Sequence, residues 1–406
     1  MLKTELLEII SHGENSGVEF KRDDIRPEQL AKEVVAMLNF RGGMVLLGIE
    51  DDGTISGIQK DNLEEWVMNV IQSKIHPMFL PFYSEVRIDE QKTVAIISFP
   101  QGISKPYVVR HNGKEDIYIR VGSKSALATR EQQMRLFELG GMLHTEVMPV
   151  PRTSFDSLDK ARLENYLKDV MQDPDVPSSD EAWQQRLLGL GFLAEAAGNI
   201  CCTIAGLVLF GKSPRRYLKQ TGLRVLAFDG VDKSYAALLD EVIDAPMVGR
   251  WDKAPVTRHP FDSGLIERFT QLIKPFITQE ADELIDGVRH SAQWLYPQDA
   301  VREAVVNALA HRDWTRFVDI EVSIYSDRME IISPGALTNS MTIEKMIAGQ
   351  RSPRNPLIIE VLRDYGYVEH RGMGVRVKII PLMREFSGKD PKFEATEDYL
   401  KTTLYR

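Results

Sequence analysis

The sequence predicts a multidomain protein of the α/β (α+β) class, and three observations carry that prediction. The chain has 406 residues, enough for two or three domains of ~100–200 residues each. Its 43% hydrophobic and 27% charged residues are ordinary globular usage. Short apolar runs typical of strands alternate with segments whose apolar residues recur at helical spacing.

Two breaks in composition divide the chain into three expected domains. Pro149 and Pro151 interrupt regular structure in the stretch MPVPRT. A second break lies around 285–297, just before a strongly helical segment. The expected domains are, in order, mixed α/β, mainly helical and again α/β: residues 1–147, 153–290 and 291–406.

In the first domain, Pro27 fits the first turn of a helix whose apolar residues recur mostly at helical spacing. The segment Arg41-Gly42-Gly43 ends this helix, and Asp51-Asp52-Gly53 predicts a tight turn. Alternating or continuous apolar runs predict the strands of this domain: Met44–Ile49, Ile55–Ile58, Thr93–Phe99 and Ile117–Val121.

Farther along the chain, one or two strands are expected in the mainly helical middle, such as Arg224–Phe228. The last domain begins with a helix over Asp299–His311. Paired strands over Val318–Tyr325 and Met329–Ile332 follow it, and helices with a glycine-containing turn end the chain.

Charge and cysteine content exclude several classes of protein. The formal net charge of −9 excludes coating of nucleic acid by bulk charge, so such contact needs a local basic patch. The only cysteines are the adjacent Cys201 and Cys202, which excludes a disulfide framework and a cysteine-based zinc site. The longest uncharged stretch, 196–211, is too short to span a membrane, and the first ten residues do not form a signal peptide. We expect a reduced, cytoplasmic chain without a membrane partner.

Three carboxylates form the first candidate site. Glu14 and Glu19 flank a small turn in GENSGVEFK, and Lys21 shares a strand face with Glu19. Asp51 follows the strand over 44–49, so all three carboxylates converge if that strand pairs beside Val18–Phe20. Clustered carboxylates favour a divalent cation, which can activate water and hold a phosphodiester, while Lys21 stabilises developing charge. The alternative is a set of solvated surface acids in a chain that has 59 acidic residues.

The first part of the chain contains four separate motifs, GENSGVEFK, LNFRGG, MVLLGIEDDGTISGI and KPYVVRHNGKEDIYIRVGSKSALAT. Residues 1–135 resemble a Schlafen AlbA-type domain, because these four motifs of that domain occur here in the same order. The resemblance implies cleavage of transfer RNA or another nucleic acid with Mg²⁺ or Mn²⁺ held by Glu14, Glu19 and Asp51. Asp52 competes for the third position. Because this chain has one such lobe, a composite groove requires a dimer or larger homo-oligomer.

A basic stretch offers the candidate contacts to a nucleic-acid backbone. Arg120-Val-Gly-Ser-Lys124 resembles a phosphate-facing strand end, and the alternative is a charged hairpin surface. The predicted contacts are Lys105, Arg110, Lys114, Arg120 and Lys124, with His111 and Arg130 in the same stretch.

A literal match to the Walker A pattern, Gly206 to Ser213, is rejected as a phosphate site. A phosphate loop needs exposed backbone N–H groups, whereas Leu207–Phe210 is a run that favours burial. Pro214 also removes a donor where a following helix should present one. The segment is predicted to be buried and to end in a turn.

The second candidate site lies on the helix REAVVNALAHRDW. Glu303, Asn307 and His311 recur every four residues, so they share one helix face. These three side chains either line a site or face solvent. Asn307 bears most on that choice, because exposed helix faces usually carry pairs of Lys, Arg and Glu rather than Asn. Spacing alone leaves both options open.

This helix resembles the N-box of histidine-kinase-like ATPases. Together with IYSDRMEIISPGAL, RSPRNPLI and GYVEHRGMGVRV, the stretch 295–380 resembles the carboxy-terminal ATPase-like domain of RecG-related regulators. The resemblance implies ATP as ligand, with Glu303 as base, Asn307 as ligand to Mg²⁺, and His311 on the same face. It also implies that Gly335, Gly372 and Gly374 mark turns near the phosphates. The usual Asp-x-Gly-x-Gly adenine box is replaced by Ser333-Pro334-Gly335.

Three functions follow as hypotheses. The first is a metal-dependent Schlafen-type nuclease controlled by ATP, a logic that suits anti-phage defence. The second is an ATP-responsive DNA-binding transcriptional regulator that does not cut. The third is a structural subunit in which both sites are degenerate. Glu14, Glu19, Lys21 and Asp51 favour the first over the second, and Glu303 with Asn307 argues against the third.

Overall fold

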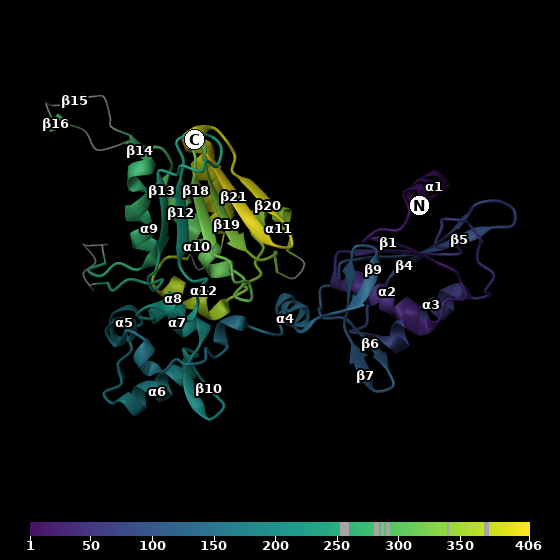
Figure 1. Cartoon of the computed structure of the whole chain (residues 1–406), viewed down its shortest axis with the longest axis horizontal. Coiled ribbons are helices and arrows are strands. Elements are labelled where there is room, and N and C mark those ends of the chain that lie inside the picture. Colours follow the sequence, from purple (N-terminus) through teal and green to yellow (C-terminus); the bar gives the residue numbers. More distant parts are fainter. Residues whose placement is uncertain (252–259, 280–283, 286–287, 290–292, 339–340, 369–372) are drawn as a thin grey trace. The chain divides into compact units, whose positions relative to one another are not determined.

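The computed structural model divides into two compact units, Met1–Leu143 and His144–Arg406. Figure 1 shows a mixed α/β architecture in each unit, which confirms the predicted fold class. Of the whole chain, the structure describes residues 1–251, 260–279, 284–285, 288–289, 293–338, 341–368 and 373–406.

Unit 1 is built on a four-stranded sheet in the order β1-β2-β5-β4. Strands β1 and β2 pair side by side, as the carboxylate hypothesis required; they are parallel, and the other neighbours are antiparallel. The strand bounds are β1 Val18–Lys21, β2 Gly42–Leu47, β5 Thr93–Pro100 and β4 Phe82–Arg87.

Helices cover both faces of this sheet, so consecutive residues of β2 and β5 are buried. Val45 and Ile97 pack into one core beneath α2 (Pro27–Asn39) and α3 (Leu63–Lys74). Phe20, on the other face, packs into a second core with α1 (Lys3–His12). The sheet therefore separates two apolar layers.

Short strands and one helix complete unit 1. Strand β3 pairs with β6 and β6 with β7, whereas β8 and β9 form a hairpin beside α2. Their bounds are β3 Ile75–His76, β6 Val108–His111, β7 Lys114–Asp116, β8 Tyr118–Val121, β9 Lys124–Leu127 and α4 Arg130–Leu139.

Unit 2 begins with small helices and one hairpin, packed on the same core as the sheet that follows. The hairpin joins β10 to β11. The bounds are η1 Thr145–Val147, η2 Phe155–Ser157, α5 Lys160–Asn165, η3 Tyr166–Val170, α6 Asp180–Gly189, β10 Leu193–Ala196, β11 Asn199–Cys202, α7 Ile204–Phe210 and α8 Pro214–Tyr217.

A six-stranded sheet in the order β13-β12-β18-β19-β21-β20 forms the centre of unit 2. Strands β12 and β18 are parallel and the remaining pairs are antiparallel. The bounds are β13 Leu239–Ile243, β12 Leu223–Ala227, β18 Ile320–Ile324, β19 Arg328–Pro334, β21 Tyr399–Tyr405 and β20 Lys392–Ala395.

Further helices and short strands complete unit 2, and α10 packs against β19. The helix bounds are α9 Leu265–Ile273, η4 Lys274–Phe276, α10 Gln298–His311, α11 Ile343–Ile347, α12 Pro356–Asp364, η5 Val375–Ile379 and α13 Ile380–Ser387. The short strands are β14 Thr278–Gln279, β15 Leu284–Ile285, β16 Val288–Arg289 and β17 Gln293–Trp294.

The buried Glu146 fixes the amino end of α12. Its two carboxylate oxygens accept the backbone N–H groups of Leu357 and Ile358, each at 2.8 Å. These are donors that no residue within the helix can satisfy. Burial raises the pKa of Glu146 to about 7, although both N–H bonds act in the opposite direction. The segment just before α12 is thereby held in place.

The compact units differ from the three expected domains. The middle and last parts share one sheet, because β12 pairs with β18 from nearly a hundred residues later, and they share one apolar core. The boundary expected near residue 290 therefore does not separate compact units, and the first boundary falls at residue 143. Sequence composition does not report such long-range pairing.

The rejection of the Walker A match is confirmed. Residues Ile204–Phe210 form helix α7, and every one of them is buried. Their backbone N–H groups are therefore not exposed to a phosphate. Within the described part of the chain, no helix has both the length and the apolar character needed to cross a membrane.

Candidate functional site

A cavity of about 240 Å³ lies in unit 2 between α10 and the sheet. The predicted residues Glu303, Asn307 and His311 all line it, because their four-residue spacing places them on the α10 face that looks toward β19. Gly335 and Gly374 line the same cavity. Gly372 lies outside the described residues.

The floor of the cavity follows from the register of three neighbouring strands. Ile331 on β19 pairs with Thr402 on β21, and Thr402 pairs with Phe393 on β20. Directly paired residues share a sheet face, as do residues two positions apart. Ser333 and Leu400 therefore lie on that face too, and all five line the cavity.

Glu303 and Asn307 form the polar end of the cavity. The Asn307 amide nitrogen donates to Glu303 Oε1 at 3.3 Å, and Lys378 Nζ lies 3.8 Å from Glu303 Oε2. Gly374 packs directly on this carboxylate, since a Cβ there would lie 1.7 Å from Glu303 Oε1. With this amide orientation, Asn307 Oδ1 accepts no hydrogen bond from a described residue and can act as a ligand.

Two buried charged residues, Arg354 and Asp313, lie beside the part of the cavity lined by His311 and Gly335. Burial, together with the positive charge of Arg354, lowers the pKa of His311 to about 4, so its ring is neutral near pH 7. Arg354 is 4% exposed, donates to the Ala336 carbonyl and lies 3.5 Å from Asp313 Oδ2. Gly335, at φ +118°, packs against Asp313 and leaves no room for a side chain.

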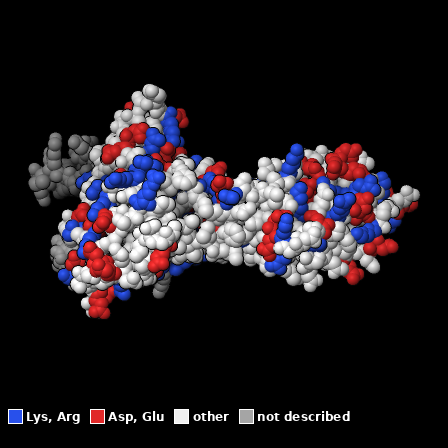
Figure 2. All heavy atoms as spheres, turned by 60° about the horizontal axis from the view of Figure 1, so that its bottom comes forward, with Lys and Arg blue, Asp and Glu red and all other residues white. Residues whose placement is uncertain are grey.

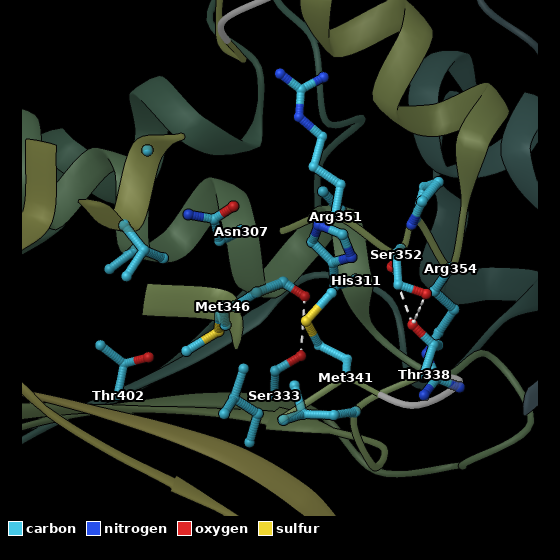
Figure 3. Close-up of a pocket in the computed structure, with 18 of the residues that line it drawn as sticks. Asn307, His311, Ser333, Thr338, Met341, Met346, Arg351, Ser352, Arg354 and Thr402 are labelled. Carbon is cyan, nitrogen blue, oxygen red and sulfur yellow. Dashed lines mark hydrogen bonds between the residues drawn. The ribbon is translucent and has the colours of Figure 1, made fainter. Parts of the chain in front are cut away.

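Several lining residues were not singled out from the sequence. Figure 3 shows the sulfur atoms of Met341 and Met346 between His311 and the floor residues Ser333 and Thr402. Arg351 also lines the cavity. The motif RSPRNPLI drew attention to Arg351 and Arg354 as a group, and Ser333 was noted only where it replaces the adenine box, but no sequence signal marked Thr402.

In unit 1, the three predicted carboxylates do come together, and they surround Lys21. Lys21 Nζ lies 2.8 Å from Glu19 Oε1, 3.5 Å from Glu14 Oε1 and 3.4 Å from Asp51 Oδ1. Burial lowers the pKa of Lys21, but the hydrogen bond and charge of Glu19 raise it more, so the net shift is upward. The ammonium group thus lies where a metal ion was expected.

The second oxygen of Glu19 is also engaged. Glu19 Oε2 accepts from Arg120 Nη1 at 2.8 Å, and the same nitrogen lies 3.1 Å from Glu33 Oε2. Arg120 Nη2 donates to the Asn15 carbonyl at 2.7 Å. No group of three metal-ligating side chains has the geometry of a metal site in the described parts of the chain. As arranged, the carboxylates fit Lys21 and Arg120 rather than Mg²⁺ or Mn²⁺.

The predicted nucleic-acid contacts fall into two groups. Lys105 and Arg120 are 4% and 5% exposed, so they do not lie on the surface where backbone contacts were expected. Lys105 Nζ donates to the Phe40 carbonyl. Arg110, Lys114 and Lys124 are exposed, and Arg110 pairs with Glu115. Figure 2 shows acidic and basic side chains interspersed on the visible face of unit 1.

Two family models match the chain. Residues 14–129 match "Schlafen, AlbA_2", and residues 318–404 match "Putative ATP-dependent DNA helicase recG C-terminal". Both resemblances are confirmed. The AlbA_2 region contains the Lys21 cluster, whereas the RecG-related region contains the floor of the cavity but not α10, which carries Glu303 and Asn307.

Similarity to solved structures is low. The DIP2311 protein of Corynebacterium diphtheriae is 22% identical, with a TM-score of 0.45, covering 96% of this chain and 75% of that one. The N-terminal domain of a putative ATP-dependent DNA helicase RecG-related protein from Nitrosomonas europaea is 23% identical, with a TM-score of 0.25, covering 32% of this chain and 93% of that one. No curated protein matches.

Proposed function

We propose that the chain is an ATP-binding protein that acts on nucleic acid, with ATP bound in the cavity of unit 2. The observation that carries this proposal is Asn307. Its amide nitrogen is bonded to Glu303, which leaves its oxygen as a ligand beside a buried carboxylate. Amide and carboxylate oxygens are ligands suited to Mg²⁺, and Mg²⁺ accompanies ATP.

The opposite end of the cavity suits a nucleobase. Ile331, Leu400 and Phe393 make an apolar floor, and two methionines face them. Apolar walls with a few polar groups are typical of small-molecule sites. The cavity's polar end and apolar end thus match the two halves of a nucleotide.

We assign the role of general base in ATP hydrolysis to Glu303. A carboxylate near the terminal phosphate can take a proton from water. Asn307 and Lys378 hold its two oxygens. Its contact with Gly374 further restricts where that carboxylate can lie.

Calorimetric titration with a non-hydrolysable ATP analogue and Mg²⁺ tests the nucleotide proposal. Asn307→Ala is expected to weaken binding about tenfold or more, because a charge-assisted contact is lost. The matched control is Asn199→Ala, at an exposed position on β11. Absence of binding heat in the wild-type protein, or equal binding in both variants, contradicts the proposal.

A metal-dependent nuclease is the second candidate, favoured by the convergence of Glu14, Glu19 and Asp51 on one cation. An open hollow of about 510 Å³ lies beside Lys21 and Asp51. Because the carboxylates fit Lys21 better than a metal ion, we derive no metal-dependent step. A protein that binds nucleic acid without cutting it is the direct alternative.

Digestion of transfer RNA and DNA with Mn²⁺ or Mg²⁺ separates these two alternatives. Asp51→Asn is the sharper variant, since this side chain is 84% exposed whereas Glu19 is buried in ion pairs. A nuclease that uses Asp51 would lose cleavage on the order of 100-fold in Asp51→Asn and keep it in Asp52→Asn. No cleavage by the wild-type protein, or equal cleavage by Asp51→Asn, leaves only the non-cutting binder.

A further inference from the structure

We propose that Ser333 accepts a hydrogen bond from the exocyclic amino group of the bound base, so that the cavity selects ATP over inosine triphosphate. This inference rests on the proposed function and deepens it. It assigns base selection to a hydroxyl group on the cavity floor, where a carboxylate of the adenine box would be expected.

The direction of the Ser333 hydrogen bond follows from its partner. Ser333 is 6% exposed, and its Oγ lies 2.9 Å from the backbone carbonyl of Ala308 on α10. A carbonyl oxygen can only accept, so the hydroxyl hydrogen must point to Ala308. Ser333 can therefore only accept a hydrogen bond from a ligand, through the lone pairs of Oγ. Figure 3 shows Ser333 at the foot of the cavity.

Three other polar or acidic groups around the cavity already have partners or lie at its other end. The Thr338 hydroxyl lies within hydrogen-bonding distance of the Ser352 carbonyl and hydroxyl, at 2.9 and 2.8 Å. Asp313, the buried acid next to Gly335, accepts from the Thr315 backbone at 2.8 Å and lies 3.5 Å from Arg354. Glu303 is the carboxylate among the described residues that line the cavity, and it belongs to the polar end.

Because Ser333 Oγ can only accept a hydrogen bond from the ligand, it distinguishes adenine from hypoxanthine, two purines of nearly equal shape. Adenine presents an amino group at carbon 6, which can donate to Ser333. Hypoxanthine presents a carbonyl oxygen there, which would face a second acceptor at close range. Sites that hydrogen-bond a substrate group reject analogues that cannot make the bond, because a buried polar group is left without a partner.

Titration of wild-type protein and Ser333→Ala with ATP and inosine triphosphate, both with Mg²⁺, tests the inference. The wild-type protein is expected to bind ATP on the order of tenfold more tightly, and Ser333→Ala is expected to lose that preference. Loss of the bond to Ala308 weakens both nucleotides alike, so the ratio of the two affinities is the readout.

The other outcomes overturn the inference, and they distinguish a failure of base selection from a failure of nucleotide binding. Equal wild-type affinities, or an unchanged ratio in Ser333→Ala, overturn base selection by Ser333 and leave the nucleotide site intact. If the wild-type protein binds neither nucleotide, the proposed function fails and this inference fails with it.

Discussion

Replacing Arg120 with alanine is expected to destabilise unit 1 by about 3–5 kcal/mol, the usual cost of breaking a buried ion pair. The Arg120 side chain is fully buried and bridges Glu19, Glu33 and the Asn15 carbonyl. Burial raises the pKa of Glu33, which shows how unfavourable its carboxylate is there. Without Arg120, two buried acids remain without their shared cation.

Scanning calorimetry of the full chain measures this effect. The unfolding transition of unit 1 is expected to move down by about 10 °C or more. Arg110→Ala is the matched control, because the Arg110–Glu115 pair is half exposed and contributes at most ~1 kcal/mol. A similar shift of the unfolding temperature in both variants would show that the buried ion pairs of Arg120 do not contribute more to the stability of unit 1 than an exposed pair does.

Placing a methyl group at Gly374 is expected to weaken binding of the ATP analogue about 100-fold. The new Cβ would lie 1.7 Å from Glu303 Oε1 and 2.4 Å from its carboxyl carbon, so the carboxylate must move. Movement toward the cavity brings a negative charge against the phosphates of the nucleotide. The contacts of Glu303 with Asn307 and Lys378 are disturbed at the same time.

Gly189→Ala, in helix α6, is the matched control. A Cβ there meets no atom within 4 Å. This variant is expected to bind the analogue as the wild-type protein does and to gain up to ~1 kcal/mol in stability from helix propensity. Unchanged affinity in Gly374→Ala would show that the position of Glu303 does not control the site.

The sequence was sufficient where the information is local. Apolar spacing predicted the helix over 299–311, observed as α10 at 298–311, and its four-residue rows predicted that Glu303, Asn307 and His311 share one face. Burial of Leu207–Phe210 was equally readable from its apolar run. These features depend on neighbours within a few turns of the same helix.

The sequence was insufficient where distant segments decide the outcome. Arg120 belongs to a basic run and was predicted to contact phosphate, but it pairs with Glu19, 101 residues earlier in the chain. Strand alternation shows that side chains point to opposite faces, not which face another element covers. The position of Lys21 among three carboxylates likewise depends on the parallel pairing of β1 with β2.

The base end of the cavity illustrates the same limit. Ser333 and Thr402 are 69 residues apart and reach one floor through the register of β19 and β21. A serine and a threonine are common residues, so only their placement marks them. The replacement of the adenine box by Ser333-Pro334-Gly335 was visible in the sequence, whereas the position of Ser333 on the cavity floor and its bond to Ala308 were not.

A crystal structure of the full chain with a non-hydrolysable ATP analogue and Mg²⁺ tests the central claim most directly. We expect the purine on the floor formed by Ile331 and Thr402, with its amino group at Ser333, and the metal ion at Asn307 Oδ1. A nucleotide bound at any other place, or a cavity without nucleotide in crystals grown at saturating concentration, would contradict the account.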